Sequence, residues 1–418
     1  MSEVILLIAA ILALGFIALE IFKRTKVSQV IILILLGMVL GPLLNVVDAG
    51  PGSLIRDLTP FVSTIALIFL LFDAGLTLDL RTVIEEFGKA SLFTLLVFFV
   101  SSFVIALFSL AFLGLPFLFA LLLGFICGGV SSAIVLAMVE NAGLGENVKT
   151  MLSLESTFTD ILVVIFSLLV FNTIMASQVS DPLNMILVTI SVSLITALIA
   201  YATWLVIFTR VETHNLSYIL TVAVMLFLYA IAERAGGNGG FSVFVFGLLL
   251  GNFSILEKYF LFLGGLKGEI YKLLVSEIKR FDAEIAFFIR TFLFVLTGLL
   301  ISFEGITVTV FLFAILITLI IALIRYPIFK YLYKDESEWE ARFVSAMVPR
   351  GLAAIVVVTI LPELVKAGQK ALIAPYIGTI EIVTILVVLF SNILASGGTF
   401  LLYKEKSAIE EIEESAKA

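Results

Sequence analysis

The sequence contains little of what soluble enzymes, disulfide-linked domains and zinc proteins are built from. Only 14% of its 418 residues are charged, whereas soluble domains carry about 25%. Its one cysteine, Cys127, excludes an intramolecular disulfide, and we expect it to pack as a small buried residue. Its one histidine, His214, lies in a polar loop, which excludes a zinc site of the His-Glu-x-x-His type. We therefore expect neither an enzyme nor a resident cofactor.

Apolar residues dominate instead, making up 61% of the chain with a mean hydropathy of +1.22. An apolar run of about 20 residues is long enough to span a bilayer as a helix. Such runs lie near 3–22, 28–46, 60–77, 90–112, 117–139, 150–173, 183–209, 216–233, 239–253, 282–301, 306–329, 341–360 and 376–402. We therefore predict an all-α polytopic membrane protein with 13 transmembrane helices, whose partner is the lipid bilayer and not nucleic acid.

Two stretches are charged rather than apolar. Residues 254–281 alternate charged and bulky apolar side chains, which predicts an interfacial segment. Residues 404–418 form an acidic tail. With this arrangement, eighteen Lys and Arg residues fall on one face of the membrane and four on the other. The positive-inside rule then predicts a multi-pass protein of the cell membrane with its N-terminus outside and its C-terminus in the cytoplasm.

The two halves of the chain resemble each other. GMVLGPL at 37–43 matches GLLLGNF at 247–253, and VSSAIVLAMV at 130–139 matches GLAAIVVVTI at 351–360. FLLFDAGLTLDL at 69–80 also resembles FLFVLTGLLISF at 292–303, which pairs Gly75 with Gly298, and a fourth match follows the same order. Spans 1–6 therefore correspond to spans 8–13. Because seven crossings separate the first spans of the two halves, the halves run in opposite directions. Such inverted repeats are typical of secondary transporters.

Equivalent spans of the two halves are interrupted. Span 5 contains Gly-Gly-Val-Ser-Ser at 128–132, and span 12 contains Val-Pro-Arg-Gly at 348–351. A membrane helix tolerates such an interruption where other groups satisfy the freed backbone. Both could be ordinary kinks, but two interrupted helices in equivalent positions favour a binding site where they cross.

Asp160 in span 6 is the strongest candidate for the ion-binding residue. A carboxylate at membrane depth costs roughly 3 kcal/mol, and such a residue usually marks an ion or proton path. Ser156 and Thr159 lie close to it in the sequence and offer further oxygen ligands for a monovalent cation. A desolvated carboxylate can hold either a proton or a cation, and this competition is sufficient for an exchanger. The alternative is a structural carboxylate paired with an arginine.

Five other charged residues inside spans suggest ion pairs. Glu155 lies on a different side of span 6 from the candidate ion ligand, so we expect a structural pair with Arg325, or else with Arg350. Asp73, near the end of span 3, could pair with Arg290 in span 10, the repeat partner of span 3. A gating role is the alternative for this second pair.

With these motifs the chain resembles the cation:proton antiporter superfamily, and within it the sodium–proton exchanger branch that includes NhaP proteins. Residues 155–160, ESTFTD, are similar to the family pattern E-S-x-x-N-D, and LFDAGLTLDL at 71–80 is similar to L-F-E-G-G-L-x-L-D. Arg325 and PRGLA at 349–353 resemble the core arginine and the L-R-G stretch of that family. The resemblance implies that Asp160 binds the ion, with a ligand from the neighbouring serine.

The fold of that family implies a homodimer. Each protomer would have a scaffold domain, residues 1–80 and 176–302, and a core transport domain, residues 88–175 and 303–403. Transport would proceed by an elevator-type movement of the core. We therefore expect a secondary active transporter that exchanges Na⁺, or Li⁺, for H⁺. Because the sequence has one carboxylate at the Thr159-Asp160 position and no lysine in any span, we predict electroneutral 1:1 exchange.

Span 5 departs from the family pattern, because Val130-Ser131-Ser132, or Ser131-Ser132-Ala133 with a shift of one residue, replaces its Thr-Asp-Pro. We expect these residues to contribute oxygen ligands in place of a second carboxylate. A site with one carboxylate and several hydroxyls has a weaker field, so a K⁺/H⁺ antiporter is the alternative. A sodium-coupled organic-solute symporter is the second alternative, although few Asn, Gln or Tyr residues near the breaks could line a wide polar cavity.

Overall fold

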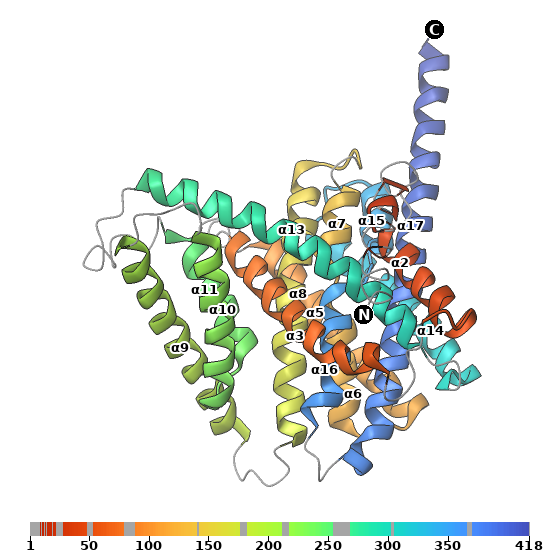
Figure 1. The fold of residues 1–418 in the computed structure, drawn as a ribbon. Helices are drawn as coiled ribbons and strands as arrows, with labels where there is room; N and C mark the ends of the chain where they lie inside the picture. Colours follow the sequence, from red (N-terminus) through yellow and green to blue (C-terminus); the bar gives the residue numbers. More distant parts are fainter. Residues whose placement is uncertain are drawn as a thin grey trace. The chain divides into compact units, whose positions relative to one another are not determined.

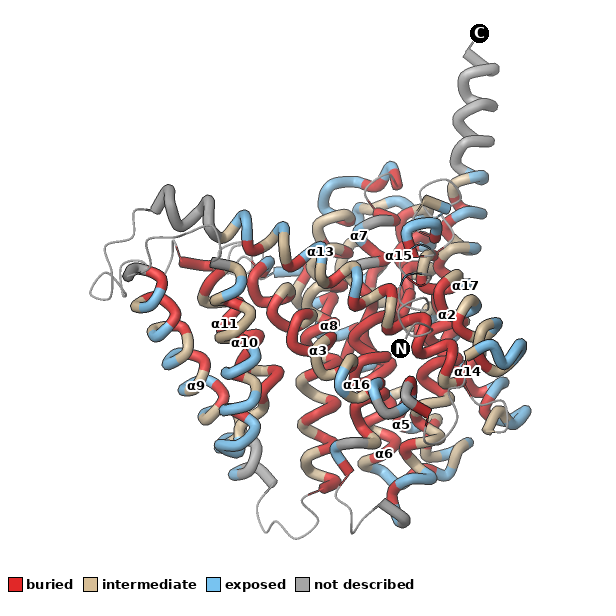
Figure 2. Tube along the Cα trace, viewed as in Figure 1, coloured by how far each residue is buried: buried red, intermediate tan, exposed pale blue. Residues whose placement is uncertain are grey.

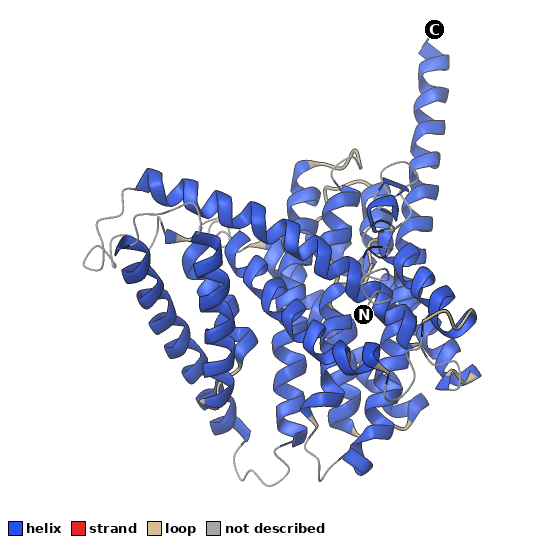
Figure 3. Ribbon diagram, viewed as in Figure 1, coloured by secondary structure: helices blue, strands red, loops and turns tan. Residues whose placement is uncertain are grey.

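The computed structural model describes residues 9, 11, 13, 15–18, 20, 21, 28–47, 53–78, 88–139, 142–175, 182–210, 217–253, 268–301, 305–365 and 370–417. Regular structure in this part of the chain is helical throughout (Figure 3), which confirms the all-α prediction. The first predicted span, 3–22, lies mostly outside the described residues, as does the first half of the predicted interfacial segment, 254–267.

The helices follow one another along the chain as Figure 1 labels them. They are α2 (Gln29–Met38), the π-helix η1 (Val39–Leu43), α3 (Leu54–Thr77), α5 (Lys89–Leu113), α6 (Phe117–Gly128), α7 (Ser132–Val139), α8 (Glu146–Met175), α9 (Pro182–Arg210), α10 (Ser217–Arg234), α11 (Gly239–Gly251), α13 (Gly268–Leu300), α14 (Val308–Leu332), α15 (Glu338–Ala346), α16 (Leu352–Leu364) and α17 (Lys370–Lys417).

Seven helices of the described part are long and apolar enough to cross a membrane: α3, α5, α8, α9, α13, α14 and α17. Shorter apolar helices occupy Gln29–Leu43, Phe117–Gly128, Gly239–Gly251 and Leu352–Pro362. The exposed positions along α9 (Figure 2) include Leu187, Ile195 and Ile199, which are apolar side chains suited to contact with lipid. The fold is therefore that of a multi-pass membrane protein, and the number of thirteen spans stays a prediction.

The helices group into two compact units. Unit 1 contains residues Met1–Pro60, Glu86–Ile174 and Thr291–Ala418, and unit 2 contains Phe61–Glu85 and Met175–Arg290. Within unit 1, α5 packs against α6 and α14, and α17 packs against α6, α14 and α16. Within unit 2, α9, α10 and α11 pack against one another.

Glycines of the sequence repeat lie at close helix contacts in both units. In unit 1, Gly37 of α2 faces Gly298 of α13, and a Cβ added to either would lie 2.8 Å from the Cα of the other. In unit 2, Gly75 of α3 faces α11, where a Cβ on Gly247 would lie 2.5 Å from the carbonyl oxygen of Phe72. Gly37 and Gly247 are equivalent in the repeat, as are Gly75 and Gly298. Small residues thus allow equivalent helices to approach closely in both halves.

Two helices extend beyond the predicted spans. The sequence places an interfacial segment up to residue 281 and a span from 282, but α13 runs unbroken from Gly268 to Leu300. No proline and no glycine occurs between residues 269 and 297, so nothing in the chain ends the helix there. In the same way α17 continues through the acidic tail to Lys417.

Candidate ion-binding site

Both predicted interruptions are present, and they touch each other. Residues 129–131 separate α6 from α7, and residues 347–351 separate α15 from α16. The backbone N–H of Ser131 donates to the carbonyl oxygen of Pro349 at 2.8 Å. A Cβ added to Gly351 would lie 2.5 Å from the Cβ of Ser131, so only glycine fits at this crossing. The interrupted helices of the two sequence halves therefore meet through their backbones.

Thr159 of α8 satisfies the backbone of the first break. Its hydroxyl accepts a hydrogen bond from the N–H of Val130 at 3.0 Å and donates to the carbonyl oxygen of the same residue at 3.2 Å. A Cβ on Gly129 would lie 2.9 Å from the Thr159 carbonyl oxygen, so glycine lets α8 approach the break. Backbone groups freed inside a membrane need partners of this kind. The motif alone did not indicate this role for the threonine hydroxyl.

The carboxylate of Asp160 lies at the first residue of α7. Its Oδ2 accepts hydrogen bonds from the backbone N–H of Ser132 at 3.0 Å and from the Ser132 hydroxyl at 2.7 Å. The Asp160 side chain is only 8% exposed. The partial positive charge at a helix N-terminus stabilises such a carboxylate. The structure thus brings a buried carboxylate and a hydroxyl together beside the crossing, and both are oxygen ligands that a hard cation accepts.

The two other serines of the predicted site are also buried. The Ser156 hydroxyl donates to the carbonyl oxygen of Ser153 one turn earlier in α8, at 3.1 Å. Ser131 is 2% exposed and occupies the crossing itself, where its N–H is committed to the second break. In this structure the Ser156 hydroxyl and the Ser131 N–H both donate hydrogen bonds to backbone carbonyl oxygens.

Glu155 and Arg325 form a fully buried ion pair. The two guanidinium Nη atoms donate to the two carboxylate oxygens, the Nη2–Oε2 distance being 2.8 Å. Arg325 Nε donates to the carbonyl oxygen of Val344 at 2.8 Å, and its guanidinium carbon lies 5.6 Å from the ring centroid of Phe93. The pair therefore connects α8, α14, α15 and α5 within unit 1. Since its two charges cancel, the pair is neutral by itself.

The guanidinium of Arg350 binds backbone carbonyl oxygens, a role that the sequence did not indicate. Its Nε donates to the carbonyl oxygen of Cys127 at 2.8 Å and its Nη1 to that of Val348 at 2.9 Å. The first carbonyl belongs to the last turn of α6 and the second to the break after α15, where helix dipoles favour a cation. Ser391 and Asn392 of α17 bind the backbone N–H and carbonyl of Arg350, at 3.0 and 2.7 Å. A Ser-Asn dipeptide inside an apolar span was the available sequence signal.

Asp73 in unit 2 has an acidic neighbour that the sequence analysis missed. Asp282 of α13 lies near its carboxyl group, as does the predicted partner Arg290, and neither oxygen of Asp282 has a hydrogen-bond partner among the described residues. Asp282 is 2% exposed. It lies at the predicted boundary of span 10, where a charged residue is expected, and for that reason it did not stand out.

Among the described residues, no group of three or more His, Cys, Asp or Glu side chains is placed to hold a metal ion. A transported cation at Asp160 would therefore be bound by one carboxylate together with hydroxyl and backbone carbonyl oxygens. Such a ligand set suits a weakly held monovalent ion, which must also leave the site.

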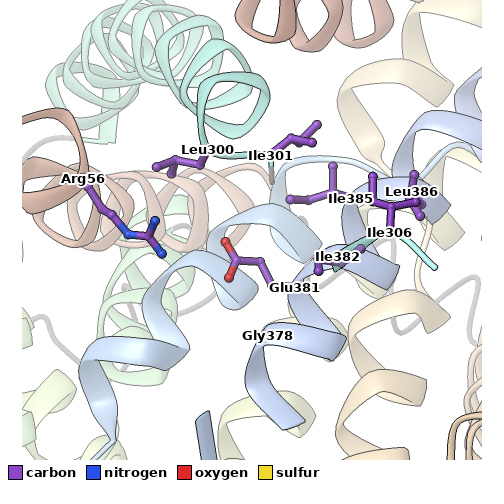
Figure 4. A pocket seen from close by; sticks show the side chains of 9 residues that line it. All are labelled: Arg56, Leu300, Ile301, Ile306, Gly378, Glu381, Ile382, Ile385 and Leu386. Atoms are coloured by element: carbon purple, nitrogen blue, oxygen red, sulfur yellow. The ribbon is translucent and has the colours of Figure 1, made fainter. Parts of the chain in front are cut away.

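A separate cavity of about 190 Å³ lies in unit 1 beside α17. In Figure 4 the side chains of Arg56 and Glu381 point toward one another across it, and the remaining lining side chains are apolar. The cavity contains none of the residues that the sequence predicted for ion binding. It is therefore distinct from the site at the crossing.

Comparison with known proteins supports the family that the sequence motifs resemble. Residues 7–404 match the family described as sodium/hydrogen exchanger, transmembrane. The chain is 23% identical over 403 residues to the probable Na⁺/H⁺ antiporter 2 of Methanocaldococcus jannaschii, covering 91% of this chain and 92% of that one. It is 30% identical over 203 residues to the Na⁺/H⁺ antiporter ApNhaP of Aphanothece halophytica, covering 46% of this chain and 36% of the relative.

The fold is similar to that of the sodium proton antiporter MjNhaP1 from Methanocaldococcus jannaschii, with a TM-score of 0.78, 20% sequence identity and coverage of 96% of this chain and 98% of that chain. Because the family match extends over nearly the whole sequence and the helices adopt an antiporter fold, the chain belongs to the sodium/hydrogen exchanger family of membrane transporters.

Proposed function

We propose that this protein exchanges Na⁺ for H⁺ and that Asp160 carries both in turn. The observation that supports this assignment is the position of its carboxylate, which is buried and hydrogen-bonded to the start of α7 beside the crossed breaks. Half-helix ends and freed carbonyl groups are how secondary transporters build ion sites. Family membership supports cation/proton antiport in general, and the residue assignment is our inference.

The proposed mechanism is competition between H⁺ and Na⁺ for the carboxylate of Asp160. In the low dielectric of the membrane, the ionised carboxylate requires either a proton or a cation in contact with it. Binding of one therefore displaces the other, and an empty ionised site is unfavourable. Because the Glu155–Arg325 pair is neutral by itself, one Na⁺ replaces one H⁺ without a change in the charge carried. We infer electroneutral 1:1 exchange.

We propose alternating access by an elevator-type movement. The predicted ion ligands and the Glu155–Arg325 pair all belong to unit 1, and we assign the moving core to residues 88–175 and 303–403. Residues 1–80 and 176–302 would form the scaffold of a homodimer in the cell membrane. The N-terminus would lie outside and the C-terminus in the cytoplasm. The native mass of the purified protein in detergent tests the dimer.

The central test is proton flux in proteoliposomes, driven by gradients of Na⁺, Li⁺ or K⁺. Asp160→Asn keeps an oxygen that can accept from Ser132, but it cannot bind a proton, so we expect cation-dependent flux to disappear. Asp335→Asn removes an exposed carboxylate and serves as the matched control with unchanged flux. Retention of cation-driven flux in Asp160→Asn would refute the assignment. A rate that follows an imposed membrane voltage would refute electroneutrality.

Potassium is the alternative cargo, because Val130, Ser131 and Ser132 supply no carboxylate at the break. The same assay with K⁺ compares the two ions directly. Replacing Ser131 or Ser132 by Asp strengthens the negative field of the site, and we expect the Na⁺/K⁺ preference to shift toward Na⁺. If neither substitution changes the preference, these serines are not ion ligands. The solute symporter gains no support from the family match.

A further inference from the structure

We propose that Ser28, the residue before α2, positions the second break of the ion site through Asn392 of α17, and that this contact is released when the core moves. This role rests on the elevator-type movement proposed above, in which α2 belongs to the scaffold and α17 to the core. In this structure α2 packs against α17 within unit 1. Ser28 is thus a positioning residue and not an ion ligand.

Three hydrogen bonds connect Ser28 with α17 and the break. The Ser28 hydroxyl donates to Oδ1 of Asn392 at 2.8 Å, and Nδ2 of Asn392 donates to the carbonyl oxygen of Arg350 at 2.7 Å. The N–H of Ser28 donates to the hydroxyl of Ser396, one turn later in α17, at 3.1 Å. Ser28 and Asn392 are both buried. A residue of α2 therefore reaches the backbone of the break through a single side chain.

The Ser28 hydroxyl fixes the orientation of the Asn392 amide. An asparagine amide has an acceptor end and a donor end. With Oδ1 bound by Ser28, Nδ2 faces the carbonyl oxygens of Arg350 and Val388, at 2.7 and 2.8 Å. The reversed amide would turn its oxygen toward these two carbonyl oxygens. Without the Ser28 hydroxyl, the buried Oδ1 loses its donor, which is unfavourable.

The break that Asn392 binds is in contact with the ion site. Arg350 follows Pro349, whose carbonyl oxygen accepts the N–H of Ser131 at 2.8 Å. The next residue along the chain, Ser132, binds the carboxylate of Asp160 through its N–H and its hydroxyl. Because hydrogen bonds depend steeply on distance and angle, a shift of the break changes the ligands around the carboxylate. Ser28 therefore influences cation affinity without touching the cation.

Capping of its own helix is the ordinary role for a serine at this position. Ser28 is the N-cap of α2, where a serine side chain usually accepts from the first turn, but in the described part of the chain it makes no such bond. By the match of 37–43 with 247–253, its equivalent is Asn238, the N-cap of α11. Asn238 does cap its helix, accepting from the N–H of Phe241 at 2.8 Å. The Ser28 hydroxyl is directed to the break instead.

The partner residue also differs between the two halves of the repeat. DILVVIFSLL at 160–169 resembles TILVVLFSNI at 384–393, which pairs Leu168 with Asn392. A leucine side chain has no hydrogen-bonding group. The inverted repeat therefore does not require this polar contact, which is specific to the second half.

Movement of the core past the scaffold separates α17 from α2. A hydrogen bond is lost once donor and acceptor lie more than about 3.5 Å apart, so a small displacement already releases Ser28 from Asn392. The Asn392 amide then holds the break less firmly. The site thus binds its cation more tightly in the position of the core seen here than after the movement.

The first test measures proton flux in proteoliposomes over a range of Na⁺ concentrations. We expect Ser28→Ala to raise the half-saturating Na⁺ concentration about fivefold, the factor for one net hydrogen bond, without lowering the maximal rate per folded protein. Ser28→Thr retains the hydroxyl and should resemble the wild type. Ser109→Ala removes a buried hydroxyl that donates within its own helix and is the control. An unchanged half-saturating concentration in Ser28→Ala would overturn the proposal.

A double-variant cycle tests whether Ser28 acts through Asn392. Asn392→Ala should also raise the half-saturating concentration, and adding Ser28→Ala to it should change nothing further. Independent sites give additive effects, so additivity here would refute the proposed connection. If Asn392→Ala does not fold, the comparison of Ser28→Ala with Ser28→Thr decides the case.

The release is tested by cross-linking. Cys127→Ala removes the only cysteine of the chain, and Ser28→Cys with Ser396→Cys then places two thiols at the contact, which Hg²⁺ can bridge. We expect exchange to stop with Hg²⁺ and to return with a dithiol. Full exchange by the cross-linked protein would refute the release. Failure of the proposed function is distinguishable, because exchange would then be absent from the wild type and from the protein before cross-linking.

Discussion

The N–H of Ser131 donates to the carbonyl oxygen of Pro349, and this single hydrogen bond joins the two interrupted helices. One of its ends belongs to the first sequence half and the other to the second. Each break would expose unsatisfied backbone groups in a membrane, which cost several kcal/mol each if left alone. Their direct contact, with Thr159 and Arg350 around it, explains how both breaks are tolerated at the same place.

Thr159→Val removes the hydroxyl that binds both backbone groups of Val130 while keeping the shape of the side chain. Because a buried N–H loses its partner, we expect destabilisation by about 1–3 kcal/mol. Thr159→Ser retains the hydroxyl and is the matched control. Thermal unfolding of the purified variants measures the difference. Equal midpoints for the valine and serine variants would show that the hydroxyl does not stabilise the break.

Arg325→Met leaves Glu155 as an unpaired charge in the core, and breaking a buried pair in this way costs about 3–5 kcal/mol. The double variant Glu155→Met/Arg325→Met removes both charges with side chains of similar length. We expect it to unfold at a higher temperature than either single variant. The measurement is the thermal midpoint of all three proteins in the same detergent. A double variant less stable than both single variants would contradict a simple charge-pairing role.

Gly351→Ala places a methyl group against the Cβ of Ser131, where only 2.5 Å is available. The two breaks must then separate, so we expect lower stability and loss of exchange. Ser131→Gly removes the opposing Cβ, and the double variant Gly351→Ala/Ser131→Gly should recover much of the stability. Thermal midpoints and proteoliposome flux report the two effects. No recovery in the double variant would place the steric conflict elsewhere.

Glu340, at the start of α15, has a carboxylate with several donors. Burial alone would raise its pKa, but N–H groups of Gly145 and Ser337 and the Ser337 hydroxyl donate to it, and together they hold the pKa below its ordinary value. The Ser337–Glu340 contacts form a capping box. A lowered pKa in the folded state means that the ionised carboxylate stabilises the fold above the ordinary pKa. This contribution is lost as the pH falls through the folded-state value.

Glu340→Gln should therefore lower the stability at neutral pH, by about 1 kcal/mol if it acts as a helix cap. In acidic buffer the wild-type residue is itself protonated, and the two proteins should become equally stable. Exposed Asp335→Asn is the control for general charge effects. Thermal midpoints across pH give the comparison. A difference that persists unchanged in acid would exclude ionisation of Glu340 as its cause.

Much of the architecture could be predicted from patterns along the chain. Apolar runs predict membrane helices because a bilayer requires about 20 apolar residues per span. The repeat predicts paired interruptions, and both are found, at 129–131 and 347–351. The continuity of α13 through residue 281 was not predicted, because charged residues within a helical stretch do not end a helix unless a residue that breaks it is present.

The site was predictable in its residue types and less so in its contacts. Asp160 stands out in an apolar run since a charge there is costly. The sequence did not indicate the roles of Thr159 and Arg350, because both side chains bind backbone N–H or carbonyl groups. Every residue has such groups, so no residue type in the sequence marks these partners. Asp282 was missed because a charged residue is expected at a predicted span boundary, and only the tertiary structure shows that it is 2% exposed.

The sequence by itself determined that this chain is a membrane transporter with inverted repeats and a buried carboxylate, since hydrophobicity, repetition and isolated charge are properties of the linear pattern. The tertiary structure alone decided which arginine neutralises Glu155, which helix end holds Asp160 and which backbone carbonyl groups bind Arg350. Those outcomes depend on distances of a few ångströms between helices far apart along the chain, and spacing in a sequence carries no information about them.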